Sequence, residues 1–184
     1  MALDRITLAH FRNHAASRLD GAAHLNLLVG ENGAGKTNVL EALSLLAPGR
    51  GLRRAALNEM AGSGGPGAFA VSAALECRDG LLRQAQDDRV MLGTGTQAGR
   101  PRRRIVQVNG AETSAVSLGE WLAVGWLTPT MDGLFTDSAG VRRRYMDRLV
   151  LALDPAHARH ASRYEAGLRE RNRLLADDTE PDPQ

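Results

Sequence analysis

The chain has 184 residues, of which 43% are hydrophobic and 24% charged, and its formal net charge is +2. These values are typical of an ordinary globular protein that is long enough to bury a core. A single cysteine, Cys77, excludes an internal disulfide framework. The sequence has neither a signal-peptide pattern nor an apolar run long enough to span a bilayer, so we expect a cytoplasmic protein with no membrane partner.

Two segments near the N-terminus have the pattern of β-strands. Residues 3–11 alternate imperfectly between apolar and polar side chains, and residues 19–29 form the second segment. The last five residues of the second segment, 25–29, are an apolar run that ends at a glycine. Buried strands of parallel sheets have this pattern. We therefore predict strands over 3–11 and 19–29, the second of them buried.

A glycine-rich loop, GENGAGKT, follows at residues 30–37 and contains Lys36, the only lysine of the chain. It fits the pattern G-x-x-x-x-G-K-[ST] of a phosphate-binding P-loop, with a predicted strand before it. An amphipathic helix is predicted after it and ends at Pro48 and Gly49. Its apolar face is predicted to consist of Val39, Leu40, Leu43 and Leu46, and its outer face of Asn38, Glu41 and Ser44.

Each part of such a loop has a physical role in binding a nucleoside triphosphate. The glycines let backbone N–H groups converge on a phosphate, and the helix N-terminus adds its dipole. Lys36 is expected to reach the β- and γ-phosphates, and Thr37 to bind Mg²⁺ through its hydroxyl. We therefore predict ATP and Mg²⁺ as cofactors, with Thr37 as the metal contact. The predicted nucleotide-binding residues are Gly30, Glu31, Asn32, Gly33, Ala34, Gly35, Lys36, Thr37 and Asn38.

The middle of the chain is predicted to form a small, mostly antiparallel sheet. After the flexible connection GSGGPG, strands are predicted over 68–76 and 104–109, and the pair Asn109-Gly110 favours a hairpin turn. Cys77, beside the first of these strands, has no basic cluster next to it and is expected to be inert. A short helix from Ser117 to Trp121 and a buried strand over 123–127 follow.

Two helices are predicted in the C-terminal part. The first begins near Ser138, and the second begins at the pair Asp154-Pro155 and ends at about Ala176. The run LVLALDP, 149–155, is similar to a Walker B strand that ends in a carboxylate. Its apolar residues have helical spacing and no second carboxylate follows, so we interpret it as a helix and its cap.

Two basic clusters, RPRRR at 100–104 and RRR at 142–144, admit two interpretations. Solvated surface charge is the simpler one, and Arg143 is spaced to pair with Asp147 on a helix. The other is contact with nucleic-acid phosphates, which would be independent of sequence and sensitive to salt. The candidates for that contact are Arg102, Arg103, Arg104, Arg142, Arg143 and Arg144.

Several segments resemble the ATPase heads of the RecF and SMC group and, within it, the RecF family. They are FRNH, the P-loop with the following LEAL, PGRGLR, TPTMDGLF, RRRYMDRLV and YEAGLRERNRLL. Together they cover nearly the whole chain in RecF order. The resemblance implies an α/β fold, a P-loop ABC-type ATPase head with a mixed sheet, flanking helices and an inserted small antiparallel sheet. We divide the chain accordingly into an ATPase core (1–60), a small antiparallel β subdomain (61–115), a helical region (116–176) and an acidic, disordered tail (177–184).

The resemblance also implies a function. RecF proteins bind DNA at single-strand gaps and junctions in an ATP-dependent manner, form ATP-dependent homodimers, and act with RecO and RecR to load RecA. We therefore expect a role in recombinational repair, replication restart and the SOS response.

RecF proteins are about twice as long as this chain, and their second half carries the Walker B carboxylates and the signature loop. Neither motif is found here, since SLGEW at 117–121 lacks the glycine pair and glutamine of a signature loop. We therefore expect a fragment that binds ATP without appreciable turnover. One alternative is a P-loop small-molecule kinase with RPRRR as its lid, which leaves FRNH and RRRYMD unexplained. A degenerate gene fragment is the other.

Overall fold

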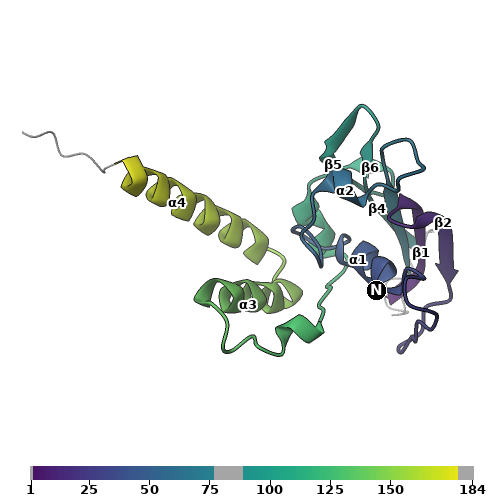
Figure 1. Ribbon diagram of the computed structural model, residues 1–184, viewed down its shortest axis with the longest axis horizontal. Coiled ribbons are helices and arrows are strands. Elements are labelled where there is room, and N and C mark those ends of the chain that lie inside the picture. The colour runs from purple at the N-terminus through teal and green to yellow at the C-terminus, as the bar shows by residue number, and fades with distance from the viewer. Residues whose placement is uncertain (1, 77–88, 178–184) are drawn as a thin grey trace, which may run out of the picture. The chain divides into compact units, whose positions relative to one another are not determined.

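The computed structural model describes residues 2–76 and 89–177, and it divides into two compact units, Met1–Leu127 and Thr128–Gln184 (Figure 1). Cys77 and the predicted tail from residue 178 onward lie outside the described residues.

The first unit is built on a six-stranded antiparallel sheet with the strand order β2-β1-β3-β4-β5-β6 (Figure 1). The predicted strands over 3–11, 68–76 and 104–109 are confirmed in place. The strands are β1 (Ala2–Phe11), β2 (His14–Asp20), β3 (Ala70–Glu76), β4 (Arg89–Gln97), β5 (Arg100–Val108) and β6 (Ala111–Glu112).

The sheet joins parts of the chain that the sequence suggested were separate. Strand β1 pairs with β3, from Ala2 opposite Glu76 to Ala9 opposite Ala70. Residues from the predicted ATPase core and from the predicted small β subdomain therefore share one hydrogen-bonded sheet. The predicted turn at Asn109-Gly110 is present between β5 and β6, and both residues have positive φ, +49° and +81°, as a tight hairpin turn requires.

The helices of this unit pack on one face of the sheet. They are α1 (Lys36–Ser44), α2 (Leu57–Met60) and the 3₁₀ helix η2 (Ala115–Glu120). The core lies between them and β1, β3 and β4, and Phe11 meets Phe69 edge to face at 5.3 Å between ring centroids. Its most buried large side chains include Leu8, Leu45, Leu46, Met60, Leu75 and Leu92.

The predicted buried strand over residues 25–29 is wrong. The segment has no strand pairing, and Leu25, Leu27 and Val29 are 92%, 87% and 82% exposed. A buried parallel strand requires hydrogen-bonded neighbours and covered faces, and none lie beside this segment in the described residues. The strand predicted over 123–127 is wrong in the same way, with Leu127 80% exposed.

The second unit contains the 3₁₀ helix η3 (Pro129–Met131) and two longer helices, α3 (Ala139–Leu153) and α4 (His157–Asp177). Both predicted helices are confirmed. Residues 149–153 form the last turn of α3, so the Walker B look-alike is helical, as predicted. The pair Asp154-Pro155 lies just before α4, where Asp154 Oδ1 accepts a hydrogen bond of 2.9 Å from the N–H of Ala156.

Charged side chains of α3 contact α4. Asp147 and His157 are 2.9 Å apart, and the Arg143 guanidinium lies 5.1 Å from the centre of the Tyr164 ring. The predicted pair between Arg143 and Asp147 is therefore not formed, because each has its contact on α4. In the part of the chain that the structure describes, no helix is both long enough and apolar enough to cross a membrane.

The exposure of residues 25–29 gives a direct prediction for stability. Leu8→Ala should lower the free energy of unfolding by about 2–5 kcal/mol, because it opens a cavity under β1. The matched substitution Leu27→Ala should change it by less than about 0.5 kcal/mol. Urea denaturation of both variants of the 184-residue chain measures the difference. Equal losses would show that residues 25–29 are buried in solution.

Candidate nucleotide-binding site

The P-loop has a backbone that only glycine adopts easily at three positions, the first of which is Gly30 with φ +156°. Gly33 has φ +87° and Gly35 has φ +96°, both in the left-handed region. Gly35 is also closely packed. A Cβ there would lie 2.5 Å from Nε2 of His14 and 2.7 Å from Oδ1 of Asn13. The second glycine of the motif is therefore required by its neighbours as well as by its φ angle.

The loop leads directly into α1 and leaves backbone donors open. The N–H groups of Asn38 and Val39 donate to the carbonyl of Gly35. For the N–H groups of Lys36 and Thr37, no acceptor exists among the described residues. First-turn donors of this kind, together with the helix dipole, form an anion site.

Lys36 points back over the loop. Its Nζ donates to the carbonyl oxygens of Gly30 and Glu31, each at 2.7 Å. Phosphate oxygens are stronger acceptors than these neutral carbonyls because they carry full negative charge. The ammonium group is therefore placed to turn to a phosphate at the same loop.

A cavity of about 240 Å³ lies in front of the loop and α1. Thr37 lines it, and in the described residues its hydroxyl makes no hydrogen bond, so it is available to a cation. These residues fit a triphosphate and Mg²⁺. The lining residues are Asn32, Gly33, Gly35, Lys36, Thr37, Asn38 and Arg53.

Arg53 is a site residue that the sequence analysis missed as such. It adds a second positive charge beside Lys36, and its Nη1 donates to Oδ1 of Asn38 at 2.8 Å and to Oε2 of Glu41 at 2.7 Å. The only sequence signal was its place in the PGRGLR segment. Nothing in that segment alone indicates which of its arginines faces the loop.

Glu41 is completely buried beneath the site, which corrects the prediction that it lies on the outer face of the helix. Arg12 donates to both of its carboxylate oxygens, at 2.7 and 3.0 Å, and Arg53 donates to one of them. Ser44, predicted on the same outer face, is also buried, whereas Leu40 is 50% exposed. Val39 and Leu46 are buried and Leu43 is half-buried, as predicted, so the apolar pattern was right for these residues. It was wrong for Glu41, whose charge is buried together with its arginine partners.

Side chains at the turn between β1 and β2 form hydrogen bonds with the P-loop. Nδ2 of Asn13 donates to the carbonyl of Gly33 at 3.1 Å, and Oδ1 of Asn13 accepts from Nδ2 of Asn38 at 2.8 Å. Nε2 of His14 lies 3.2 Å from the carbonyl of Gly35, with Ser17 Oγ 2.8 Å from its Nδ1. Since the carbonyl only accepts, His14 carries its proton on Nε2 in this arrangement. The FRNH segment thus holds the P-loop backbone.

The cluster RPRRR is divided by the alternation of strand β5. Arg103 pairs with Glu112 at 3.0 Å on the exposed surface. Arg104 lies on the opposite face of the strand and donates to Gly49 O at 2.6 Å, to Thr94 Oγ1 at 2.9 Å and to Leu45 O. Burial lowers its pKa to about 10. Arg104 therefore caps the C-terminal end of α1, where a positive charge is favourable, and its guanidinium is not a free surface group.

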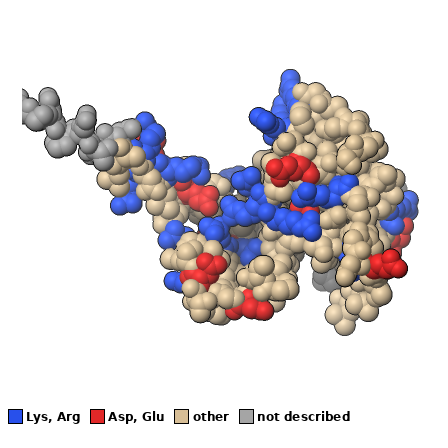
Figure 2. All heavy atoms as spheres, viewed as in Figure 1, with Lys and Arg blue, Asp and Glu red and all other residues tan. Residues whose placement is uncertain are grey.

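Other arginines remain at the surface of both units (Figure 2). Arg102 is exposed on β5. In the second unit, Arg142, Arg143 and Arg144 lie on α3, where Arg142 donates to the carbonyl of Asp137 and Arg143 contacts Tyr164.

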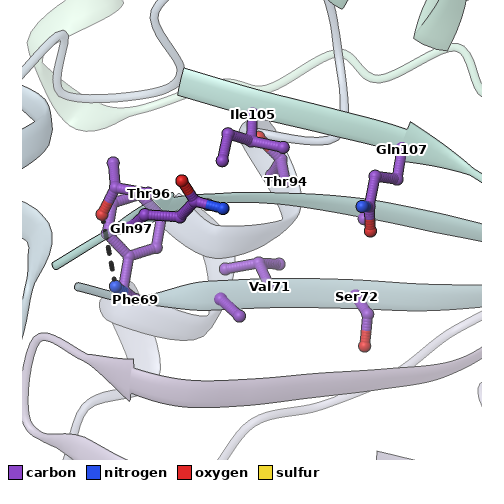
Figure 3. Close-up of a pocket in the computed structure, with 11 residues that line it drawn as sticks. Phe69, Val71, Ser72, Thr94, Thr96, Gln97, Ile105 and Gln107 are labelled. Carbon is purple, nitrogen blue, oxygen red and sulfur yellow. Dashed lines mark hydrogen bonds between the residues drawn. The ribbon is translucent and has the colours of Figure 1, made fainter. Parts of the chain in front are cut away.

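A separate cavity of about 270 Å³ lies on strands β3, β4 and β5 (Figure 3). It is lined by uncharged residues that include Ser72, Gln97 and Gln107. It shares no residue with the cavity at the P-loop. It therefore does not extend the nucleotide site.

The sequence of this chain is similar to those of known proteins. Residues 5–60 match a family model described as an AAA domain. The chain is 50% identical to "DNA replication and repair protein RecF" of Mesorhizobium japonicum and 45% identical to the protein of the same name from Brucella suis. These alignments cover 98% and 99% of this chain and 46% of each relative. The chain thus spans about half the length of the curated relatives it matches.

Solved structures agree with these relatives. The fold is similar to that of the recombination mediator protein RecF with ATP in the RecFOR pathway, at TM-score 0.76 and 25% identity, covering 99% of this chain and 47% of that one. It is also similar to the Smc head bound to the C-winged helix domain of ScpA, at TM-score 0.63 and 16% identity, covering 86% and 54%. The predicted ATPase-head fold and the resemblance to RecF are confirmed.

The burial of Glu41 predicts a large and specific destabilisation. Glu41→Ala should lower the free energy of unfolding by about 3–5 kcal/mol, because it leaves the charges of Arg12 and Arg53 without their carboxylate. The control Glu112→Ala, which removes the exposed partner of Arg103, should cost less than about 1 kcal/mol. Urea denaturation measures both. A Glu41→Ala variant as stable as the parent would contradict the buried pairing.

Proposed function

We propose that this chain, which over nearly its whole length is homologous to proteins named RecF, is the ATP-binding part of a DNA replication and repair protein of that type. The observation that carries the proposal is 50% identity over 98% of the chain. The intact P-loop, with its free donors and the charges of Lys36 and Arg53, supports ATP as the ligand.

The proposed roles of the loop residues follow from their geometry. Backbone N–H groups of the loop and of the first turn of α1 hold phosphate oxygens. Lys36 and Arg53 neutralise their charge, while Asn13 and His14 keep the loop backbone in place. Mg²⁺, when bound, supplies further charge neutralisation, and Thr37 is the residue that holds it.

The proposed biological role is that of RecF proteins. We propose a cytoplasmic protein that binds DNA at single-strand gaps and junctions, dimerises with ATP, and works with RecO and RecR to load RecA during recombinational repair, replication restart and the SOS response. Two similarities support this role. The relatives are named for DNA replication and repair, and a similar solved structure is a recombination mediator of the RecFOR pathway.

Exposed arginines are the proposed DNA contacts. Arg102 on β5 and Arg142, Arg143 and Arg144 on α3 lie where solvent and phosphates reach them. Arg103 remains a candidate because its pair with Glu112 is exposed and therefore weak. We leave Arg104 out of the proposed contact, since backbone carbonyls hold its guanidinium.

We further propose that the 184-residue chain binds ATP without appreciable turnover. The residues that line the cavity at the P-loop include no carboxylate to orient a water or to complete the ligands of Mg²⁺. The similar proteins and structures are named RecF and Smc, and they give no support to the kinase alternative.

Binding of a fluorescent ATP analogue tests the proposed site. Lys36→Ala should weaken binding by about 10- to 100-fold, since a charge-assisted hydrogen bond contributes about 1.5–3 kcal/mol. Thr37→Val should lose the gain in affinity that Mg²⁺ gives and keep the metal-free affinity. Arg169→Gln, on the surface of α4, is the control and should bind as the parent does. Parent-like binding by Lys36→Ala would refute the site, and ATP hydrolysis that Lys36→Ala abolishes would refute the absence of turnover.

A further inference from the structure

A second basic cavity, of about 350 Å³, lies at the other end of α1. It shares no lining residue with the cavity at the P-loop, and α1 between them has nine residues, or about 13 Å of helix. Arginines are its only charged residues. The lining residues are Leu45, Gly49, Arg50, Ala55, Leu57, Met60, Arg102 and Arg104.

The arginines of this cavity have no carboxylate partner within the described structure. Among the described residues of the first unit, six other arginines have a carboxylate within ion-pair distance, and Arg54 and Arg100, which do not line the cavity, have none. The six are Arg5, Arg12, Arg18, Arg53, Arg89 and Arg103. Among the described residues, no carboxylate pairs with Arg50, Arg102 or Arg104. Positive charge is therefore concentrated around one cavity without an internal counter-ion.

The arrangement of the three arginines indicates where an anion would sit. Arg104 is fixed by carbonyls at the end of α1, and its lowered pKa reflects a positive charge that burial disfavours. An anion nearby would offset that cost. Arg50 and Arg102 are exposed, so their guanidinium groups are free to meet it at the mouth of the cavity.

The other residues that line the cavity are apolar, and they favour an anion that also carries an apolar group. Leu45 and Met60 are almost fully buried, and Leu57 and Ala55 are partly exposed beside them. A small inorganic anion would leave this surface bare. A ligand that carries an apolar group next to its negative charge fills both parts. The phosphate and deoxyribose of a nucleic-acid backbone have this chemistry.

We propose that this cavity binds a backbone phosphate of DNA, with Arg50 and Arg102 on the phosphate and the adjoining sugar against Leu57. The inference rests on the proposed DNA binding and names a surface for it. It also distinguishes Arg102 from Arg100 and Arg103, because of the arginines of β5 only Arg102 and Arg104 line this cavity.

The test is fluorescence anisotropy of a labelled single-stranded oligonucleotide with the 184-residue chain over a series of salt concentrations. The variants are Arg50→Gln, Arg102→Gln and the two combined. The control is Arg18→Gln, an exposed arginine of β2 outside the cavity. The combined variant should bind several-fold more weakly, and the slope of log affinity against log salt should fall in magnitude by about 0.7 for each phosphate that the protein no longer neutralises. The control should keep both values.

Two further measurements make the result decisive. Circular dichroism and binding of the ATP analogue should be unchanged in the combined variant, because the two cavities are separate. DNA binding by the parent with an unchanged affinity and slope in the combined variant would overturn this inference alone. Absence of DNA binding by a parent that binds the analogue would overturn the proposed DNA binding and this inference together. If poly-glutamate bound as tightly as DNA and lost its binding in the combined variant, the cavity would be a site for acidic protein segments and the inference would be wrong.

Discussion

The nucleotide site depends on one buried carboxylate. Glu41 has no exposed surface, and a carboxylate in such a place is stable only when partners replace the water it has lost. Arg12 comes to it from the turn after β1, and Arg53 from the loop after α1. The bidentate contact of Arg12 fixes direction as well as distance, because a guanidinium fork meets a carboxylate in one plane. Three segments that are far apart in the sequence are thereby held at one point beneath α1.

The position of the P-loop follows from that constraint. Asn13 and His14 come directly after Arg12, so fixing Arg12 brings their side chains to the carbonyls of Gly33 and Gly35. The loop is therefore held through its acceptors on one side, and its N–H donors are left for phosphate on the other. Arg53 belongs to both the buried charge pair and the phosphate site, since it contacts Glu41 and also lines the cavity at the loop. The packing of His14 and Asn13 against Gly35 explains why a residue without a side chain is needed there in addition to the requirement of its φ angle.

What the sequence predicted correctly is mostly local. The P-loop pattern was found because its residues are contiguous and each acts through its own backbone or side chain, and the helices α3 and α4 follow from caps and spacing within one segment. The burial of Glu41 on α1 was not predicted because its partner, Arg12, lies 29 residues away and hydrophobic periodicity carries no information about a charge pair. Strand β4 was not predicted because glycines such as Gly93 and Gly95 are disfavoured inside strands, although Val90, Leu92 and Thr94 alternate. The cluster RPRRR is uniform in sequence, yet the two faces of a strand divide its arginines between a salt bridge, a helix cap and a cavity.

The two strands that were predicted and are not formed depend on partners outside their own segments. Residues 25–29 have the apolar continuity of a buried strand, yet Leu25, Leu27 and Val29 are almost fully exposed. The pattern indicates a real preference, because apolar residues in a row suit a covered strand. A strand, however, exists only through hydrogen bonds to a neighbour, and the sheet that the described residues form pairs β1 with β2 and β3 and leaves this segment outside. The P-loop needs no such neighbour for its own shape, since Asn13, His14 and Lys36 bond its carbonyls directly. The loop can therefore be formed while the segment that precedes it is unpaired. The geometry of the phosphate site does not depend on whether residues 25–29 pair with a neighbouring strand.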